Sequence, residues 1–152
     1  MIKNSASLYI KTLSFILTLL GFSCSDSTGL VEYGTPSAKF RVKGKIFSTI
    51  NGEEKPLRNI KLKLSKGYDS DSTYSGIDGN FDFTLYSFPN NSPIPLTISD
   101  IDGDENHGEF EEQKIYVDFN NATFINGDRH WYKGEATKEL GGIELTLKEE
   151  EN

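Results

Sequence analysis

Hydrophobic and polar residues alternate with a period of two along most of this chain, beginning at Phe40. In residues 40–47, FRVKGKIF, large apolar residues alternate with basic ones. Successive side chains of a β-strand point to opposite faces, so such alternation predicts strands with one buried face. Further segments with this pattern are residues 60–64, 72–86 (two strands joined at Asp78-Gly79), 96–98, 115–119 and 143–147.

Turn-forming residues separate these segments. Asn51-Gly52 predicts a tight hairpin because both residues tolerate positive φ, and three prolines interrupt the chain between residues 89 and 95. Residues 120–140 are expected to be irregular, with room for a short helical turn. Seven short strands without an amphipathic helix predict an all-β fold, an antiparallel Ig-like or transthyretin-like β-sandwich over residues 38–149. An acidic tail follows at residues 150–152.

The N-terminus has a different character. Two lysines flank its start, and an apolar run, TLSFILTLLGF, occupies residues 12–22. As a helix, this run would span about 17 Å, well short of the roughly 30 Å hydrocarbon core of a bilayer. Residues 1–23 are therefore predicted to be a cleaved signal peptide rather than a transmembrane anchor.

Cys24 is the only cysteine, and it stands between Ser23 and the polar run SDSTG. This arrangement resembles a bacterial lipobox, although Gly21 and Phe22 depart from the usual residues. The resemblance implies that Cys24 becomes the mature N-terminus and carries fatty-acyl chains, palmitate among them, that anchor the protein to a membrane. Residues 24–37 then form a polar tether, and the absence of aspartate after the cysteine favours the outer membrane over the inner one. The alternative is an ordinary secretory signal with an incidental cysteine.

Charge narrows the range of partners. Removal of residues 1–23 takes away two lysines and no acid, so 14 basic residues remain against 23 acidic ones, a net charge of −9. This balance argues against nucleic acid as a partner and against direct adhesion to anionic headgroups. No cysteine remains for a disulfide, so the mature domain must be stabilised by its core.

Two family resemblances follow from longer motifs. Residues 40–86, with KGKI, PLRNIKLKL and TYSGIDGNFDFTL, are similar to carboxypeptidase regulatory-like (transthyretin-like) modules. YGTPSAKFRVKG, DIDGDENHGEF and WYKGEATK, in this order after a lipobox, resemble the radical SAM-associated putative lipoproteins of Gram-negative envelopes. The second resemblance implies a small lipoprotein associated with a radical SAM enzyme, without an established activity of its own.

An acidic loop at residues 100–112 is the main candidate for metal binding. Oxygen ligands fall at loop positions one, three, five, seven and twelve, the spacing of a calcium-binding EF-hand loop. These residues are Asp100, Asp102, Asp104, Asn106 and Glu111. Glu105 occupies the position where that loop has glycine, and the flanking segments look like strands. The alternative is therefore a solvated hairpin loop without a metal.

Three further features are candidates for contact or modification. His130, Trp131 and Tyr132 would form a platform for a sugar or a peptide, unless Trp131 plugs one end of the sandwich. Ser27 and Ser72 lie in Asp-Ser-Thr sequences similar to a periplasmic O-glycosylation motif, and the alternative is that both are plain turn residues.

Together these features predict a non-catalytic envelope lipoprotein rather than an enzyme. The chain carries neither a nucleophile motif, a phosphate-binding loop nor a histidine-rich metal pattern. Its β-sandwich is expected to bind an envelope protein or a glycan, or to act as a scaffold. Two alternatives stay open: a substrate that the radical SAM enzyme modifies before export, and a weak calcium-binding adhesion-type module.

Overall fold

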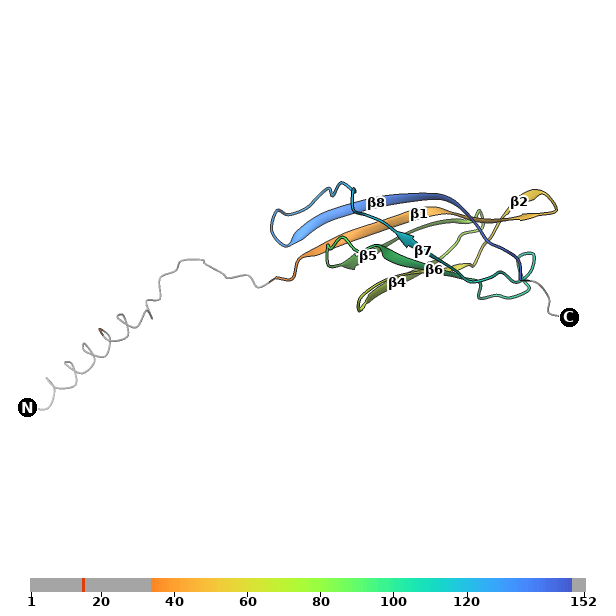
Figure 1. The fold of residues 1–152 in the computed structure, drawn as a ribbon, viewed down its shortest axis with the longest axis horizontal. Coiled ribbons are helices and arrows are strands. Elements are labelled where there is room, and N and C mark those ends of the chain that lie inside the picture. Colours follow the sequence, from red (N-terminus) through yellow and green to blue (C-terminus); the bar gives the residue numbers. More distant parts are fainter. Residues whose placement is uncertain (1–14, 16–33, 149–152) are drawn as a thin grey trace, which may run out of the picture. The chain divides into compact units, whose positions relative to one another are not determined.

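The computed structural model describes Phe15 and residues 34–148, and the latter form an all-β sandwich (Figure 1). Eight strands make up two sheets of four. Their bounds are β1 Ser37–Ile50, β2 Glu53–Pro56, β3 Lys61–Lys66, β4 Asp69–Tyr74, β5 Asn80–Ser87, β6 Ile94–Ser99, β7 Gln113–Val117 and β8 Tyr132–Glu144. The prediction of an all-β sandwich is confirmed. Among the described residues, no helix is long and apolar enough to cross a membrane.

Strand β1 organises the first sheet. It pairs antiparallel with β2 and β5 and parallel with β8. The predicted hairpin at Asn51-Gly52 joins β1 to β2, and both turn residues have positive φ, 53° and 81°. In the second sheet the strand order is β4-β3-β6-β7, and every pairing is antiparallel.

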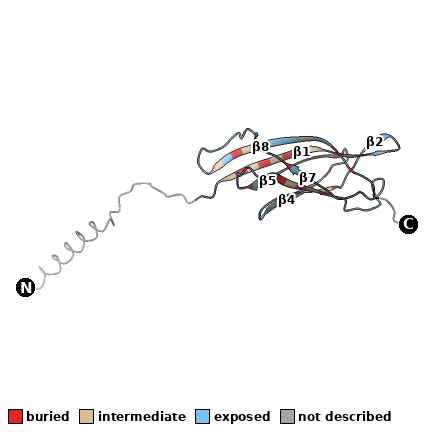
Figure 2. Cartoon of the chain, in the orientation of Figure 1, coloured by how far each residue is buried: buried red, intermediate tan, exposed pale blue. Residues whose placement is uncertain are grey.

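Alternate residues from both sheets meet in one hydrophobic core, visible as the buried segments of Figure 2. Strands β1, β3, β5 and β6 bury alternate side chains, as the pleat of a strand requires, whereas β2 and β4 bury none. The core residues buried to 2% exposure or less are Ala38, Phe40, Val42, Ile46, Leu57, Ile60, Leu62, Leu64, Ile94, Leu96, Ile98, Phe110, Val117, Ala136 and Leu145. Phe40 also contacts Phe119 and Phe124 edge-to-face, with ring centroids 5.0 and 5.9 Å apart.

Four details of the predicted fold are wrong. The described domain has eight strands rather than seven, because the polar segment Glu53–Pro56 extends the hairpin outside the core. The segment expected to be irregular contains most of β8, and residues 120–140 hold no helical turn. The sandwich is not wholly antiparallel, since β8 runs parallel to β1. Leu147, expected to face inward, lies beyond β8 and is 36% exposed.

The outer face of the first sheet carries a row of ion pairs. Four basic residues of β1 point outward, and each contacts a carboxylate on a neighbouring strand. The pairs are Lys39–Glu135 (2.9 Å), Arg41–Asp82 (2.7 Å), Lys43–Glu139 (2.6 Å) and Lys45–Glu54 (2.7 Å). The pair between Arg41 and Asp82 is bidentate, and Arg41 also reaches Glu135 at 3.5 Å. We call these contacts the charge row.

Strand β4 forms an edge of the second sheet and is polar throughout. Its sequence is DSDSTY, and all but one of its residues are exposed. An edge strand leaves backbone N–H and C=O groups unpaired, and charged side chains there oppose pairing with another chain. Asp69 and Asp71 thus protect this edge from edge-to-edge association.

Gly79 should tolerate substitution poorly. It has a φ of +75°, and a Cβ there would lie 2.2 Å from the carbonyl oxygen of Ile46. Gly52 also has positive φ, but a Cβ there would meet nothing within 4 Å. We expect Gly52→Ala to cost about 1 kcal/mol from backbone strain and Gly79→Ala about 2–4 kcal/mol from strain plus the clash. Urea unfolding of both variants measures the difference, and equal costs would contradict the described turn.

The charge row should make stability depend on acid pH. Arg41 lowers the pKa of Asp82, and Lys39 lowers the pKa of Glu135. Both folded-state pKa values thus lie below the unfolded ones. This stabilisation is fully present above the unfolded values, near pH 4, and is lost as the pH falls through the lower folded values.

We therefore expect Arg41→Gln to flatten the dependence of the unfolding free energy on pH between about pH 5 and pH 2. Arg58→Gln removes the same charge from an arginine that contacts the Asn106 amide rather than a carboxylate, and it serves as the control. Parallel pH curves for wild type and Arg41→Gln would refute this account.

Candidate functional site

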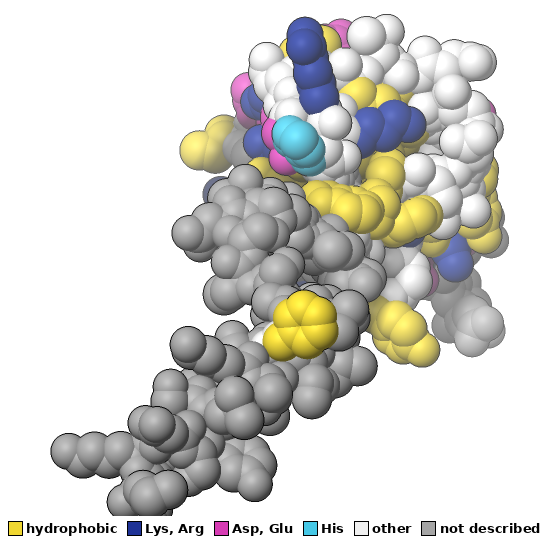
Figure 3. Space-filling model, turned by 90° about the vertical axis from the view of Figure 1, so that its left-hand side faces the viewer, with side chains coloured by type: hydrophobic (Ala, Val, Ile, Leu, Met, Phe, Trp, Pro, Cys, Tyr) yellow, Lys and Arg dark blue, Asp and Glu magenta, His cyan; other side chains and the backbone are white. Residues whose placement is uncertain are grey.

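An open hollow lies at the end of the sandwich where β1 and β8 begin. Its volume is about 500 Å³, and its lining residues are Pro36, Pro89, Phe124, Gly127, Arg129, His130, Trp131, Tyr132 and Lys133. Figure 3 views the domain from this end and shows a band of hydrophobic side chains with basic side chains beside it. The three residues predicted to contact a ligand, His130, Trp131 and Tyr132, therefore line one surface. We call it the aromatic hollow.

A short turn holds these side chains in place. The carboxylate of Asp128 accepts hydrogen bonds from the backbone N–H groups of His130 (2.8 Å) and Tyr132 (3.0 Å). Arg129, between Asp128 and His130, has a φ of +66°. Because aspartate side chains commonly cap turns in this way, the sequence DRHWY folds locally into a loop that presents successive side chains to solvent. Burial raises the pKa of the Tyr132 phenol, so this residue stays neutral at physiological pH.

Trp131 does not plug the sandwich. It is 37% exposed and does not belong to the hydrophobic core. A Cβ on Gly34 would lie 2.6 Å from Cγ of its indole, so the backbone of Gly34 rests against this ring. The interpretation of Trp131 as an interior residue is thus wrong, and the chain enters the described domain directly beside the aromatic hollow.

Cations stand over aromatic rings at this end. The Lys133 ammonium lies 4.3 Å from the centroid of Phe124, and the Lys66 ammonium lies 4.3 Å from that of Phe40. Lys66 also donates a hydrogen bond to the carbonyl of Asn90 at 3.2 Å. Burial, followed by the charge of Lys133, lowers the pKa of Lys66. This end of the domain can therefore accept an anionic group flanked by apolar surface.

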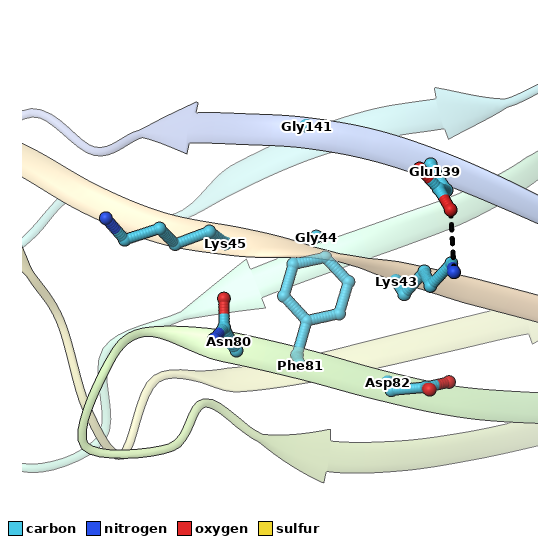
Figure 4. Close-up of a pocket in the computed structure, with 8 residues that line it drawn as sticks. All are labelled: Lys43, Gly44, Lys45, Asn80, Phe81, Asp82, Glu139 and Gly141. Carbon is cyan, nitrogen blue, oxygen red and sulfur yellow. Dashed lines mark ion pairs between the residues drawn. The ribbon is translucent and has the colours of Figure 1, made fainter.

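A second recess, on the outer face of the first sheet, offers less chemistry (Figure 4). It exists because Gly44 and Gly141 lack side chains, and a Cβ on Gly44 would lie 2.8 Å from the Gly141 carbonyl and 2.9 Å from the Phe81 ring. The charges at its rim belong to the charge row. Since each is already neutralised by a neighbour, the recess holds no free charge for a ligand.

The acidic loop is closed by its own hydrogen bonds. One oxygen of Asp100 accepts from the Asp102 N–H at 3.1 Å, and the other accepts from the N–H of the buried Phe110 at 3.0 Å. Asp102 accepts from the Asn106 amide at 2.5 Å, and Arg58 donates to that amide's oxygen at 2.7 Å. Asp100, Asp102 and Asn106 are thus brought together, near the end of the sandwich where β1 ends.

The remaining predicted calcium ligands do not join them. No group of three acidic or histidine side chains in residues 34–148 is arranged to hold a metal ion. Asp104 and Glu111 are exposed, and the backbone N–H of Glu111 donates instead to the carbonyl of Thr146. The buried Oδ1 of Asp102 lacks a hydrogen-bond partner. The described arrangement does not fit the EF-hand-like geometry, and calcium binding stays a prediction.

Two predicted modification sites, Cys24 and Ser27, lie outside the described residues. Ser72 lies on the edge strand β4 and is exposed, and its backbone N–H donates a hydrogen bond to the carboxylate of Asp71 at 2.8 Å. Ser72 is thus accessible to a modifying enzyme, and its glycosylation stays a prediction.

Sequence reasoning missed the cations of the aromatic hollow. Lys66 is the last residue of β3 and Lys133 the second residue of β8, so neither stands out from the many other lysines of the strands. Phe124 belongs to a segment without periodicity. The local signal that was present is Asp128 two residues before His130, a spacing typical of a side-chain-capped turn.

The hydrogen bonds of the acidic loop lead to a prediction about stability. In calcium-free buffer, Asp100→Ala should cost about 1–3 kcal/mol of unfolding free energy, because it leaves the partly buried N–H of Phe110 without an acceptor. Asp104→Ala removes an exposed carboxylate and should change stability by less than about 0.5 kcal/mol. Urea unfolding of both variants provides the measurement.

The same proteins test calcium binding. A rise in the wild-type melting temperature at millimolar calcium that disappears in Asp104→Ala would support a calcium site. The exposed Asp104 carboxylate would then stabilise the fold only through the bound ion. If wild type gains no stability from calcium, the loop is purely structural.

No protein-family model matches this chain, and no curated protein matches it either. The two family resemblances drawn from its motifs therefore stay predictions.

Proposed function

We propose that this protein is a non-catalytic lipoprotein of a Gram-negative envelope, anchored through Cys24, whose β-sandwich serves as a binding or scaffold module. The observation that carries the proposal is the placement of the two loop surfaces. The chain enters the domain beside the aromatic hollow, where Gly34 contacts Trp131. The acidic loop lies at the opposite end, beyond the end of β1, where Asn106 contacts Arg58.

This placement gives an anchored domain a direction. A tether that joins one end of a rigid sandwich keeps that end near the membrane and turns the other end outward. The outward end carries the acidic loop, whose carboxylates at Asp104, Glu105 and Glu111 are exposed. An envelope protein or glycan with a positive surface is the kind of partner that this end would meet. The proposed location is the outer membrane.

The association with a radical SAM enzyme rests on the three motifs that resemble the lipoprotein family. Modification of this chain by such an enzyme is a second possibility, and Cys24 as the only thiol limits it. A thioether within the mature domain is excluded by that count. A mark would have to fall on another type of side chain.

The anchor predicts a specific mass and a specific location. In a Gram-negative host, the wild-type chain should be recovered with the membranes, and its intact mass should correspond to residues 24–152 plus a diacylglyceryl group and a fatty-acyl chain. Cys24→Ala should yield protein without the membrane anchor, which lacks both the diacylglyceryl group and the fatty-acyl chain. Ser25→Ala, next to the cysteine, is the control and should keep both groups.

Mature wild-type protein without lipid would refute the proposal. A further mass increase that depends on a co-expressed radical SAM enzyme would instead establish modification.

A further inference from the structure

Three cations in or beside the aromatic hollow take part in none of the ion pairs of the described domain. Arg129 and Lys133 line the hollow, and Lys66 lies beside it, hydrogen-bonded to Asn90 next to the lining residue Pro89. None of the ion pairs among residues 34–148 includes Lys66, Arg129 or Lys133. Burial and, after it, the positive charge of Lys133 lower the pKa of Lys66. Positive charges that lie together without counter-charges favour the binding of an anion. We call these three residues the cationic cluster.

Exposed apolar side chains surround the cluster. Trp131 is 37% exposed, Phe88 48% and Ile125 56%. All three belong to the same end of the domain: Phe88 follows Ser87, which pairs with Ala38 near the start of β1, and Ile125 forms a bridge with Glu135 near the start of β8. Tryptophan and other amphipathic or apolar side chains, together with basic residues, are the combination that partitions into the headgroup layer of a bilayer.

The length of chain between the anchor and the domain limits what this end can meet. Ten Cα–Cα steps separate Cys24 from Gly34, and they reach at most about 35 Å when fully extended. The aromatic hollow, which contains Pro36 and is bordered by Gly34, therefore stays within that distance of a lipidated Cys24. Lipid headgroups are the anionic groups present there at the highest local concentration.

From these observations we propose that the aromatic hollow docks onto the phospholipid headgroups of the membrane that holds the anchor. The cationic cluster contacts phosphate groups, and Trp131 with its apolar neighbours lies in the headgroup layer. The inference rests on the proposed anchoring at Cys24. It revises the expectation that a net charge of −9 prevents contact with anionic headgroups, since the negative charge of the acidic loop lies at the far end of the domain.

The single tryptophan makes docking measurable, because Trp131 is the only one in the chain. The acylated full-length mature protein is reconstituted into vesicles of phosphatidylethanolamine and phosphatidylglycerol. Part of the phospholipid carries bromine near the top of its acyl chains. Docking brings the indole within reach of the bromines, so Trp131 emission should be quenched and shifted to shorter wavelength. Emission identical in brominated and unbrominated vesicles would overturn the proposal.

Charge-matched variants separate docking from mere tethering. Arg129→Gln combined with Lys133→Gln removes two exposed cations of the cluster and should lower the ratio of docked to undocked protein by about an order of magnitude. Lys63→Gln combined with Lys138→Gln removes the same charge at exposed positions outside the hollow and should leave quenching unchanged. Melting temperatures verify that both variants fold. Equal quenching in the two double variants would overturn the role of the cluster.

Failure of the anchor and failure of docking have different signatures. Protein that lacks acyl groups by mass and does not float with vesicles would refute both the proposed function and the docking. Protein that is acylated and floats with the vesicles, but whose Trp131 emission is not quenched by the brominated lipid, would refute docking alone. Emission that responds to an added acidic oligosaccharide and not to brominated lipid would assign the hollow to a glycan and likewise overturn lipid docking.

Discussion

The two-faced strand β1 is the constraint on which the rest of the structure depends. Its inner face supplies Phe40, Val42 and Ile46 to the core, and its outer face supplies the cations of the charge row. A shift of one residue in its pairing would exchange the faces and bury four charges, so its register is strongly determined. The pairing with β8 follows the same alternation. Lys39 opposes Glu135 and Lys43 opposes Glu139 in a parallel stretch that is bounded by two register shifts.

The alternation along the chain identified most strands because burial at every second position leaves large apolar residues there. The alternation did not identify the start of β8, for a physical reason. Its inward residues, Gly134 and Ala136, are buried but small, so the segment YKGEATKE shows no hydrophobic period. Strand β2 escaped because it extends beyond the core and has no inner face to mark. A hydrophobic pattern therefore reveals a strand only when its buried side chains are large. A strand whose inward residues are small, or which buries none, shows no such pattern.

The candidate site was predictable only in part for a related reason. His130, Trp131 and Tyr132 are adjacent in sequence, and their residue types suggested a contact surface. The cations are brought to them by tertiary structure: Lys66 reaches the core ring Phe40 from the second sheet, and Lys133 reaches Phe124 from the first. Their lack of carboxylate partners is a property of three-dimensional arrangement that no spacing in the sequence encodes. In the acidic loop, by contrast, the spacing of carboxylates suggested a metal, and the structure uses Asp100 and Asp102 to hold the loop together.

The polar edge strand β4 has a consequence under the proposed anchoring at Cys24. Molecules anchored in one leaflet meet in two dimensions, with their sheets held at similar heights and orientations, so exposed edges would encounter each other far more often than in bulk solution. Asp69 and Asp71 place negative charge along this edge, so two β4 strands that meet repel each other. Crowding at the membrane can then rise without neighbouring copies joining their sheets into a continuous fibre.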